Sequence, residues 1–288
     1  MDGNYSAENI YFDEDFIFTE DIGTITIPES GSVTVSASGK NLKEFLSTLF
    51  AKEENPIITM PSASIKLNPV TTEYEVGTVY TPKYSITFNP GSYSFGPDST
   101  GVVATYEVED TFGNMSSAAS GSFTSFDIKD DTSYAISAKV SHSDGVIPKT
   151  NLQNNYLDGQ ITANTLATIS TNKVKGYRNY FYGTTDDKGE LNSEIIRNLK
   201  GKSRNKTFSI NVPENALRVL FAFPKVSDED DFVSAKNVNA MNGETKPRFK
   251  KQIVSVYGAN DKDPIDYNVF VLDYVDPTTV TNVYDITL

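Results

Sequence analysis

The feature that most constrains the fold is a series of short segments, between residues 62 and 141, in which apolar and polar residues alternate. The alternation has a period of two, which is the side-chain period of a β-strand with one buried face. Turn-forming residues separate the segments, as at Asn89-Pro90-Gly91 and Phe112-Gly113-Asn114. The apolar positions fall into four strands: Ala63, Ile65, Leu67; Tyr84, Ile86, Phe88; Val102, Ala104, Tyr106, Val108; and Tyr134, Ile136, Ala138, Val140.

A second group of alternating segments lies between residues 173 and 288. A short helix is predicted within it, ending at Leu199 with Gly201 as its C-cap. Short alternating strands with turns between them are typical of β-sandwiches. The sequence therefore predicts an all-β fold of two tandem β-sandwiches, an immunoglobulin-like module over residues 56–172 and a second, C-terminal sandwich over residues 173–288. The strands predicted in the second have the apolar positions Phe208, Ile210, Val212; Val219, Phe221, Phe223; Tyr267, Val269, Val271; and Tyr284, Ile286, Leu288.

Residues 1–55 form a separate N-terminal segment. Residues 24–28 and 32–37 alternate on either side of a turn-like trio, which predicts a β-hairpin. A short amphipathic helix is predicted after it, over residues 41–52, with Asn41 and Glu44 at the spacing of a capping box. We expect the apolar stripe of this helix to be buried, either against the sandwich or against a partner subunit, because its members recur at i, i+3, i+4, i+7 and i+8: Leu42, Phe45, Leu46, Leu49 and Phe50.

Two aromatic segments are candidates for contacts with a partner. The first, residues 11–18, is acidic and its aromatic residues follow no clear period, so it is either a docking segment or an edge strand of the next unit. In the second, residues 177–182, alternation places Tyr177 and Phe181 on one face and Tyr180 and Tyr182 on the other. Tyr offers contact area with a polar tip, which suits core packing, subunit packing or a binding surface. The candidate attachment or oligomer contacts are Tyr11, Phe12, Phe16, Phe18, Tyr177, Tyr180 and Tyr182.

The charge balance disfavours several partners. The chain has 25 basic and 38 acidic residues and a net charge of −13. Binding to nucleic acid depends on Lys and Arg replacing the counterions of phosphate groups, so neither nucleic acid nor an anionic membrane surface is expected as a partner. No apolar run approaches the roughly 20 residues that cross a bilayer. The first residues also lack the pattern of a secretory signal, and we expect folding in a cytosol.

Chemistry-bearing residues form no recognisable constellation. Without Cys, and with His142 as its one histidine, the chain has neither a thiolate nor a multi-histidine metal site. His142 lies in a turn-like sequence, and we expect a solvated loop residue. Asp261 and Asp263 begin like a calcium loop but lack its Gly and closing Glu, and the acidic run 228–231 is expected to be a solvated loop. We therefore predict no catalytic, cofactor-binding or metal-binding residue, no cofactor, and no enzymatic activity.

Several segments resemble fibre proteins of tailed bacteriophages. Residues 39–46, running on to Pro56, look like a segment that precedes immunoglobulin-like modules in those proteins. Residues 74–78 and 89–97 are similar to the module itself, and residues 176–183, with Ala222-Phe223-Pro224, look like the C-terminal part. The similarity covers most of the chain from about residue 24. Proteins of this kind occur in phages of gut bacteria, including crAss-like phages, as head- or tail-fibre components.

The resemblance implies a non-enzymatic structural protein of the virion, a head (capsid) or tail fibre component assembled in the host cytoplasm. Its N-terminal region would attach to the particle and its β-sandwich modules would face outward. The implied partners are further copies of the chain (a trimer rather than a dimer), other virion proteins such as capsid or fibre subunits, and host surface glycans. Two alternatives stay open: a carbohydrate-binding adhesin or receptor-binding module, and a polysaccharide depolymerase, although the β-helix repeat typical of a depolymerase is not visible.

Overall fold

The computed structural model describes residues 11–19, 33–50 and 52–288. The chain divides into two compact units. The first holds the described residues of Met1–Ser64, Ile86–Glu107 and Ala138–Ile169, and the second holds Ile65–Ser85, Val108–Ser137 and Ser170–Leu288. The units alternate along the sequence, so that residues 56–172 contribute to both. Within the described ranges, no helix has the length and apolar character needed to span a membrane.

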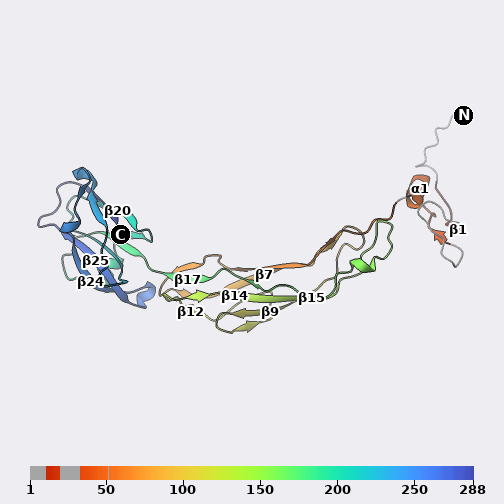
Figure 1. Ribbon diagram of the computed structural model, residues 1–288, viewed down its shortest axis with the longest axis horizontal. Coiled ribbons are helices and arrows are strands. Elements are labelled where there is room, and N and C mark those ends of the chain that lie inside the picture. The colour runs from red at the N-terminus through yellow and green to blue at the C-terminus, as the bar shows by residue number, and fades with distance from the viewer. Residues whose placement is uncertain (1–10, 20–32, 51) are drawn as a thin grey trace, which may run out of the picture. The chain divides into compact units, whose positions relative to one another are not determined.

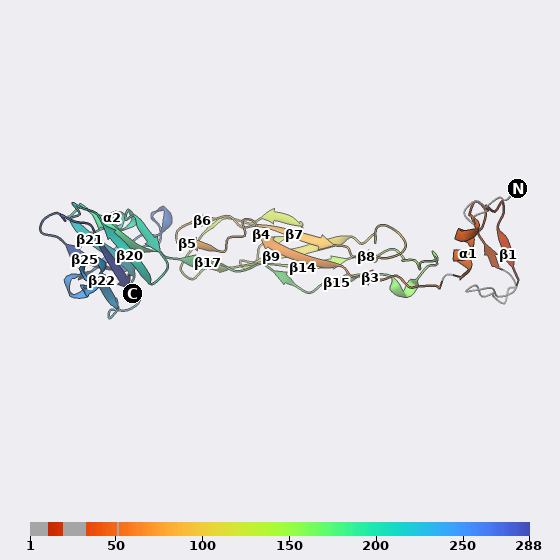
Figure 2. The ribbon, with the colours of Figure 1, turned by 90° about the horizontal axis from the view of Figure 1, so that it is seen from above.

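The fold is all-β, as predicted. In the described part, the α-helices are α1 (Leu42–Phe50) and α2 (Ser193–Arg197), and the remaining regular structure is strands in several sheets with short 3-10 turns (Figure 1, Figure 2). The 3-10 turns are η2 (Leu157–Gly159), η3 (Val238–Ala240), η4 (Lys246–Arg248) and η5 (Ala259–Asp261).

The N-terminal part of the first unit pairs a two-stranded ribbon with α1. Strand β1 (Phe16–Phe18) is antiparallel to β2 (Val33–Val35), with Phe16 opposite Val35. The predicted capping box is confirmed: the backbone N–H of Glu44 donates to Asn41 Oδ1 at 2.9 Å, and that of Asn41 donates to Glu44 Oε2 at 3.0 Å. The first strand of the predicted hairpin, residues 24–28, lies outside the described residues, and in the described part β2 pairs with β1.

Helix α1 buries only part of its apolar stripe. Phe45 and Leu49 are buried among aromatic and aliphatic side chains of the ribbon. Leu46 and Phe50 are 40% and 62% exposed. Within the chain the ribbon covers only one side of the stripe, because two strands span a narrower arc of the helix than the stripe occupies, and burial of Leu46 and Phe50 against a partner subunit stays a prediction.

Residues 58–177 form small sheets of short strands. The sheet orders are β3-β8, β11-β7-β4, β12-β6, β13-β17-β5, and β10-β9-β14-β15 with β16 also on β14. Strand β17 runs parallel to β5. The bounds are β3 (Ile58–Thr59), β4 (Ser62–Leu67), β5 (Glu73–Glu75), β6 (Val79–Tyr80), β7 (Lys83–Asn89), β8 (Ser92–Tyr93), β9 (Ala104–Asp110), β10 (Met115–Ser116), β11 (Ser120–Ser122), β12 (Phe126–Asp127), β13 (Ser133–Tyr134), β14 (Ile136–His142), β15 (Asn164–Thr165), β16 (Ile169–Ser170) and β17 (Val174–Tyr177).

The predicted turn at residues 112–114 is held by a buried aspartate. Asp110 Oδ1 accepts from the backbone N–H groups of Phe112 and Asn114, both at 2.9 Å. Its Oδ2 accepts from the hydroxyl of Tyr134 at 3.2 Å. The carboxylate thus replaces the hydrogen bonds that a tight turn leaves unmade, and burial raises the pKa of Tyr134 well above its usual range.

His142 corrects a prediction. It is the last residue of β14 and is buried, with its Nδ1–H donating to the carbonyl oxygen of Ser143 at 3.0 Å. The solvated-loop interpretation was wrong because β14 continues through His142 and the backbone leaves the strand only at Ser143.

The C-terminal part of the second unit contains two facing sheets. One has the order β19-β18-β21-β25-β24 and the other the order β20-β26-β22-β23. A layer of buried side chains from both sheets lies between them, and a second buried cluster lies on the other face of the five-stranded sheet, beneath α2. The bounds are β18 (Tyr180–Thr185), β19 (Gly201–Ser203), β20 (Thr207–Val212), β21 (Arg218–Pro224), β22 (Ser234–Asn237), β23 (Gly243–Glu244), β24 (Lys250–Val256), β25 (Ile265–Asp273) and β26 (Asn282–Thr287).

Helix α2 ends differently from the prediction. Its C-cap is Asn198, and Gly201 begins β19 instead. A Cβ on Gly201 would lie 2.2 Å from the ring of Tyr182. Glycine is therefore needed here so that an aromatic ring can lie against the backbone, and the helix does not use it as a cap.

Candidate functional site

The first aromatic segment packs mainly against its own unit. The rings of Phe12 and Phe16 each lie 4.8 Å from the ring of Phe45, and Phe18 stacks on Phe16 at 6.3 Å. Tyr11, in contrast, is exposed. Three of the four candidate contacts therefore build a small aromatic core.

An acidic residue ties this segment to the residues between β2 and α1. Asp15 Oδ1 accepts from the backbone N–H groups of Ala37 and Ser38, at 2.8 and 3.0 Å. These two bonds, that from Ser38 first, lower the pKa of the Asp15 carboxyl. The acidity of the segment thus has a structural use at this position.

The apolar surface of the N-terminal part lies on residues that the sequence analysis did not single out for contact. Ile17 is 69% exposed and lies between Phe16 and Phe18 on β1, so it points to the opposite face of the ribbon. Leu46 and Phe50 are one turn apart on α1 and are also exposed. The alternation within residues 16–18 was the signal that could have identified Ile17.

The second aromatic segment is interrupted. Strand β17 ends at Tyr177 and β18 begins at Tyr180, so the six residues are not one strand. Phe181 is buried on the α2 side of the sheet, while Tyr180 and Tyr182 pack, partly buried, against the layer between the two sheets. The ring of Tyr182 stacks on Phe208 at 4.3 Å. These two tyrosines serve internal packing, and Tyr177 lies 4.6 Å beneath the guanidinium of Arg204.

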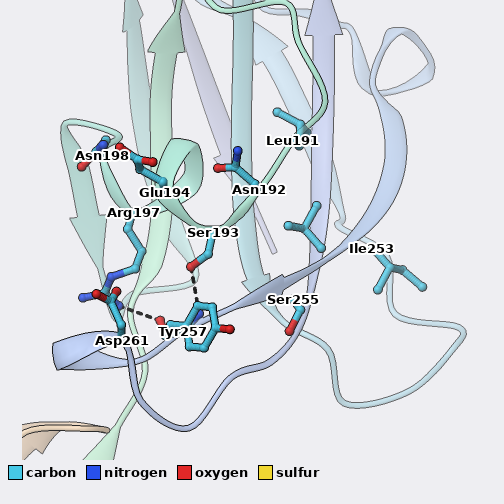
Figure 3. Close-up of a pocket in the computed structure, with 11 residues that line it drawn as sticks. Leu191, Asn192, Ser193, Glu194, Arg197, Asn198, Ile253, Ser255, Tyr257 and Asp261 are labelled. Carbon is cyan, nitrogen blue, oxygen red and sulfur yellow. Dashed lines mark hydrogen bonds between the residues drawn. The ribbon is translucent and has the colours of Figure 1, made fainter.

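A polar groove lies beside α2 in the second unit and has a volume of about 770 Å³ (Figure 3). Residues of α2 and its flanks form one side, and residues of β24 and the loop after it form the other. Exposed Tyr257, at 41%, contributes an aromatic ring to it. The lining residues are Leu191, Asn192, Ser193, Glu194, Arg197, Asn198, Ile253, Val254, Ser255, Tyr257 and Asp261.

Two hydrogen bonds fix the backbone of Tyr257 in this groove (Figure 3). Its N–H donates to Ser193 Oγ at 3.0 Å, and its carbonyl oxygen accepts from an Arg197 terminal nitrogen at 2.7 Å. The same Arg197 nitrogen donates to Glu75 at 2.8 Å. Since this pairing neutralises Arg197, the carboxylates of Glu194 and Asp261 leave the groove lining net negative.

The groove has the chemistry of a binding surface. Side-chain amides, hydroxyls and carboxylates can exchange hydrogen bonds with a ligand that carries both donors and acceptors. Among the described residues, no group of three or more His, Asp or Glu side chains is placed to hold a metal ion. The acidic run 228–231 makes local bonds: Asp230 accepts from Ser227 and Val226, and Asp228 pairs with Lys225.

No family model, no curated protein and no solved structure matches the chain.

Proposed function

We propose that the chain is a non-enzymatic structural protein of a tailed-phage virion, a head (capsid) or tail fibre component attached through its N-terminal region. The segments that resemble phage fibre proteins, from about residue 24 onward, support the class of protein. The observation that carries the attachment role is the exposure of three apolar side chains, Ile17 on the ribbon and Leu46 and Phe50 on α1, around a very small core.

A core of this size rarely stands alone. Units below about 40 residues usually need a disulfide, a metal or a partner, and the chain has no Cys. A two-stranded ribbon is itself marginal in water. A capsid or fibre subunit that covers the exposed side chains would supply the missing apolar contacts.

In this proposal the rest of the chain forms tandem β-sandwiches, with an immunoglobulin-like module before the C-terminal one. The two facing sheets and their shared aromatic layer support the C-terminal sandwich. The short antiparallel strands of residues 58–142 support the immunoglobulin-like module. The modules extend outward from a homo-oligomer, a trimer in preference to a dimer, assembled in the host cytoplasm.

Incorporation into particles tests the attachment role. The double variant Leu46→Asp/Phe50→Asp places two charges on the proposed contact surface without burying them. We expect tagged protein of this variant to be absent from particles purified from infected cells. The matched control is Met241→Asp/Val275→Asp, at two exposed apolar positions of the C-terminal part, which should incorporate normally. Normal incorporation of the first variant would contradict the proposal.

Light scattering tests the oligomer separately. We expect purified protein at micromolar concentration to have the mass of a trimer. A chain that stays monomeric at high concentration would contradict this part of the proposal, whatever the result with particles.

A second candidate function, recognition of a neutral saccharide, is favoured by the groove. The exposed ring of Tyr257 can lie against a sugar face, and the amides of Asn192 and Asn198 can bond its hydroxyls. The net negative lining disfavours an acidic glycan.

Calorimetric titration with a neutral mannan and with heparin tests this candidate. We expect the mannan to bind and heparin not to bind, and Tyr257→Ala to abolish mannan binding while thermal stability is kept. Binding of heparin in preference to mannan, or mannan binding unchanged in Tyr257→Ala, would remove the candidate.

A further inference from the structure

Within the second unit, the chain crosses from β17 to β18 in two residues, Arg178 and Asn179. The side chain of Arg178 is only 5% exposed. Its Nε and one terminal nitrogen form a bidentate pair with Asp130, at 2.8 and 2.7 Å. That terminal nitrogen also donates to the carbonyl oxygen of Asp263 at 2.8 Å. The crossing residue is therefore held from both sides, by the turn before β13 and by the loop before β25.

Three further ion pairs join the region of β5 and β12 to the C-terminal part of the second unit, as the pair of Asp130 with Arg178 does. In each, the carboxylate comes from residues 73–127 and the cation from the C-terminal part. Glu75 pairs with Arg197 at 2.8 Å, in a partly buried position. The other two pairs are Glu73 with Arg204 at 2.6 Å and Asp127 with Lys262 at 2.7 Å. The uniform direction makes the two surfaces electrostatically complementary.

A backbone contact runs beside the ion pairs. The N–H of Ala259 donates to the carbonyl oxygen of Val76 at 2.6 Å, and Asn260 Nδ2 donates to that of Gly77 at 3.1 Å. A Cβ on Gly77 would lie 2.2 Å from the oxygen of Ala259, and one on Gly258 would lie 2.3 Å from the oxygen of Val76. Both glycines are required for this close approach, and Gly77 also has a φ of +89°.

We propose that these contacts form an electrostatic clasp that holds β5, β6, β12 and β13 and the C-terminal sheets as one body without a bound metal ion. The clasp is the four pairs Glu73–Arg204, Glu75–Arg197, Asp127–Lys262 and Asp130–Arg178. Exposed ion pairs contribute little singly, but here a two-residue crossing, a buried bidentate arginine and direct backbone bonds act on the same junction. The guanidinium and ammonium groups neutralise facing carboxylates, which a divalent cation would otherwise have to do. The clasp is independent of the virion assignment.

Distance measurement between two spin labels tests the clasp. The chain has no Cys, so Lys83→Cys and Lys236→Cys, at exposed positions of β7 and β22, give the only two labelled sites. We expect a single narrow distance distribution that is the same in EDTA and in calcium. A distribution that becomes narrow only when calcium is added would overturn the proposal.

Neutralising the clasp should broaden that distribution. The clasp variant replaces its four carboxylates with isosteric amides: Glu73→Gln, Glu75→Gln, Asp127→Asn and Asp130→Asn. A control variant of equal net charge carries four exposed substitutions elsewhere in the unit, and it should keep the narrow distribution: Glu214→Gln, Asp228→Asn, Glu229→Gln and Asp276→Asn. If the distance distribution of the clasp variant is as narrow as that of the control variant, the proposal is refuted.

Two measurements keep the test valid if the clasp variant fails to fold. The wild-type chain in about 1 M NaCl, where the screening length is about 3 Å, should give a broader distribution than at low salt. Gly258→Ala should also broaden it by forcing the backbone contact apart, whereas Gly243→Ala, whose Cβ would lie 3.1 Å from its nearest neighbour, should not. A distribution unmoved by both salt and Gly258→Ala would show that the clasp does not hold the junction.

Discussion

Replacing Phe45 with alanine should unfold the N-terminal ribbon and α1 while the rest of the chain stays folded. The Phe45 side chain is buried, and its ring lies 4.8 Å from the rings of both Phe12 and Phe16. Removing a buried phenylalanine costs about 3–5 kcal/mol. A core this small supplies no more than about 3–5 kcal/mol in total, so the loss equals the whole local stability.

Hydrogen exchange of the α1 amides measures this loss directly, because it reports local opening separately from global unfolding. In Phe45→Ala the amides of residues 45–50 should exchange at the rate of an unfolded chain. The neighbouring substitution Leu46→Asp is the matched control. Leu46 is 40% exposed, so its replacement keeps the charge in water and should change protection by no more than about 1 kcal/mol.

The result that would refute this reasoning is wild-type protection of α1 in Phe45→Ala. An equal loss of α1 protection in Phe45→Ala and Leu46→Asp would also refute it, because both sides of the apolar stripe would then be buried.

Three more outcomes follow from single positions. Gly201→Ala should destabilise the C-terminal part, because its Cβ would lie 2.2 Å from the Tyr182 ring; a melting temperature equal to wild type would contradict this. Phe221→Ala removes a fully buried ring between the two sheets and should cost about 3–5 kcal/mol in denaturant titrations, and a cost below about 1 kcal/mol would show that the layer repacks freely. Hydrogen bonds from Ser227 and Val226 lower the pKa of Asp230 to about 2. The stabilisation of that turn should therefore be complete above the unfolded pKa of about 4 and be lost as the pH falls through about 2, and a carboxyl titration midpoint near 4 by NMR would contradict it.

Corrections to the predicted positions have a common physical origin. His142 and Gly201 were assigned from neighbours in the sequence, yet one is buried at a strand end and the other lies beneath Tyr182. A turn-like sequence does not reveal which of its residues still belongs to the strand. Similarly, residues 177–182, four of which are aromatic, read as one strand, but the strand is interrupted at Arg178, whose side chain pairs with Asp130.

The sequence by itself determined what depends on local periodicity and local hydrogen bonds. Period-two alternation sufficed for the all-β class, and the spacing of Asn41 and Glu44 sufficed for the capping box. Tertiary structure alone decided which half of the α1 stripe is exposed and which residues line the groove. It also joined Glu75 to Arg197, which are 122 positions apart in the chain. Such contacts depend on how strands from distant segments are placed in the folded unit, and the alternation of side chains along one strand carries no information about that placement.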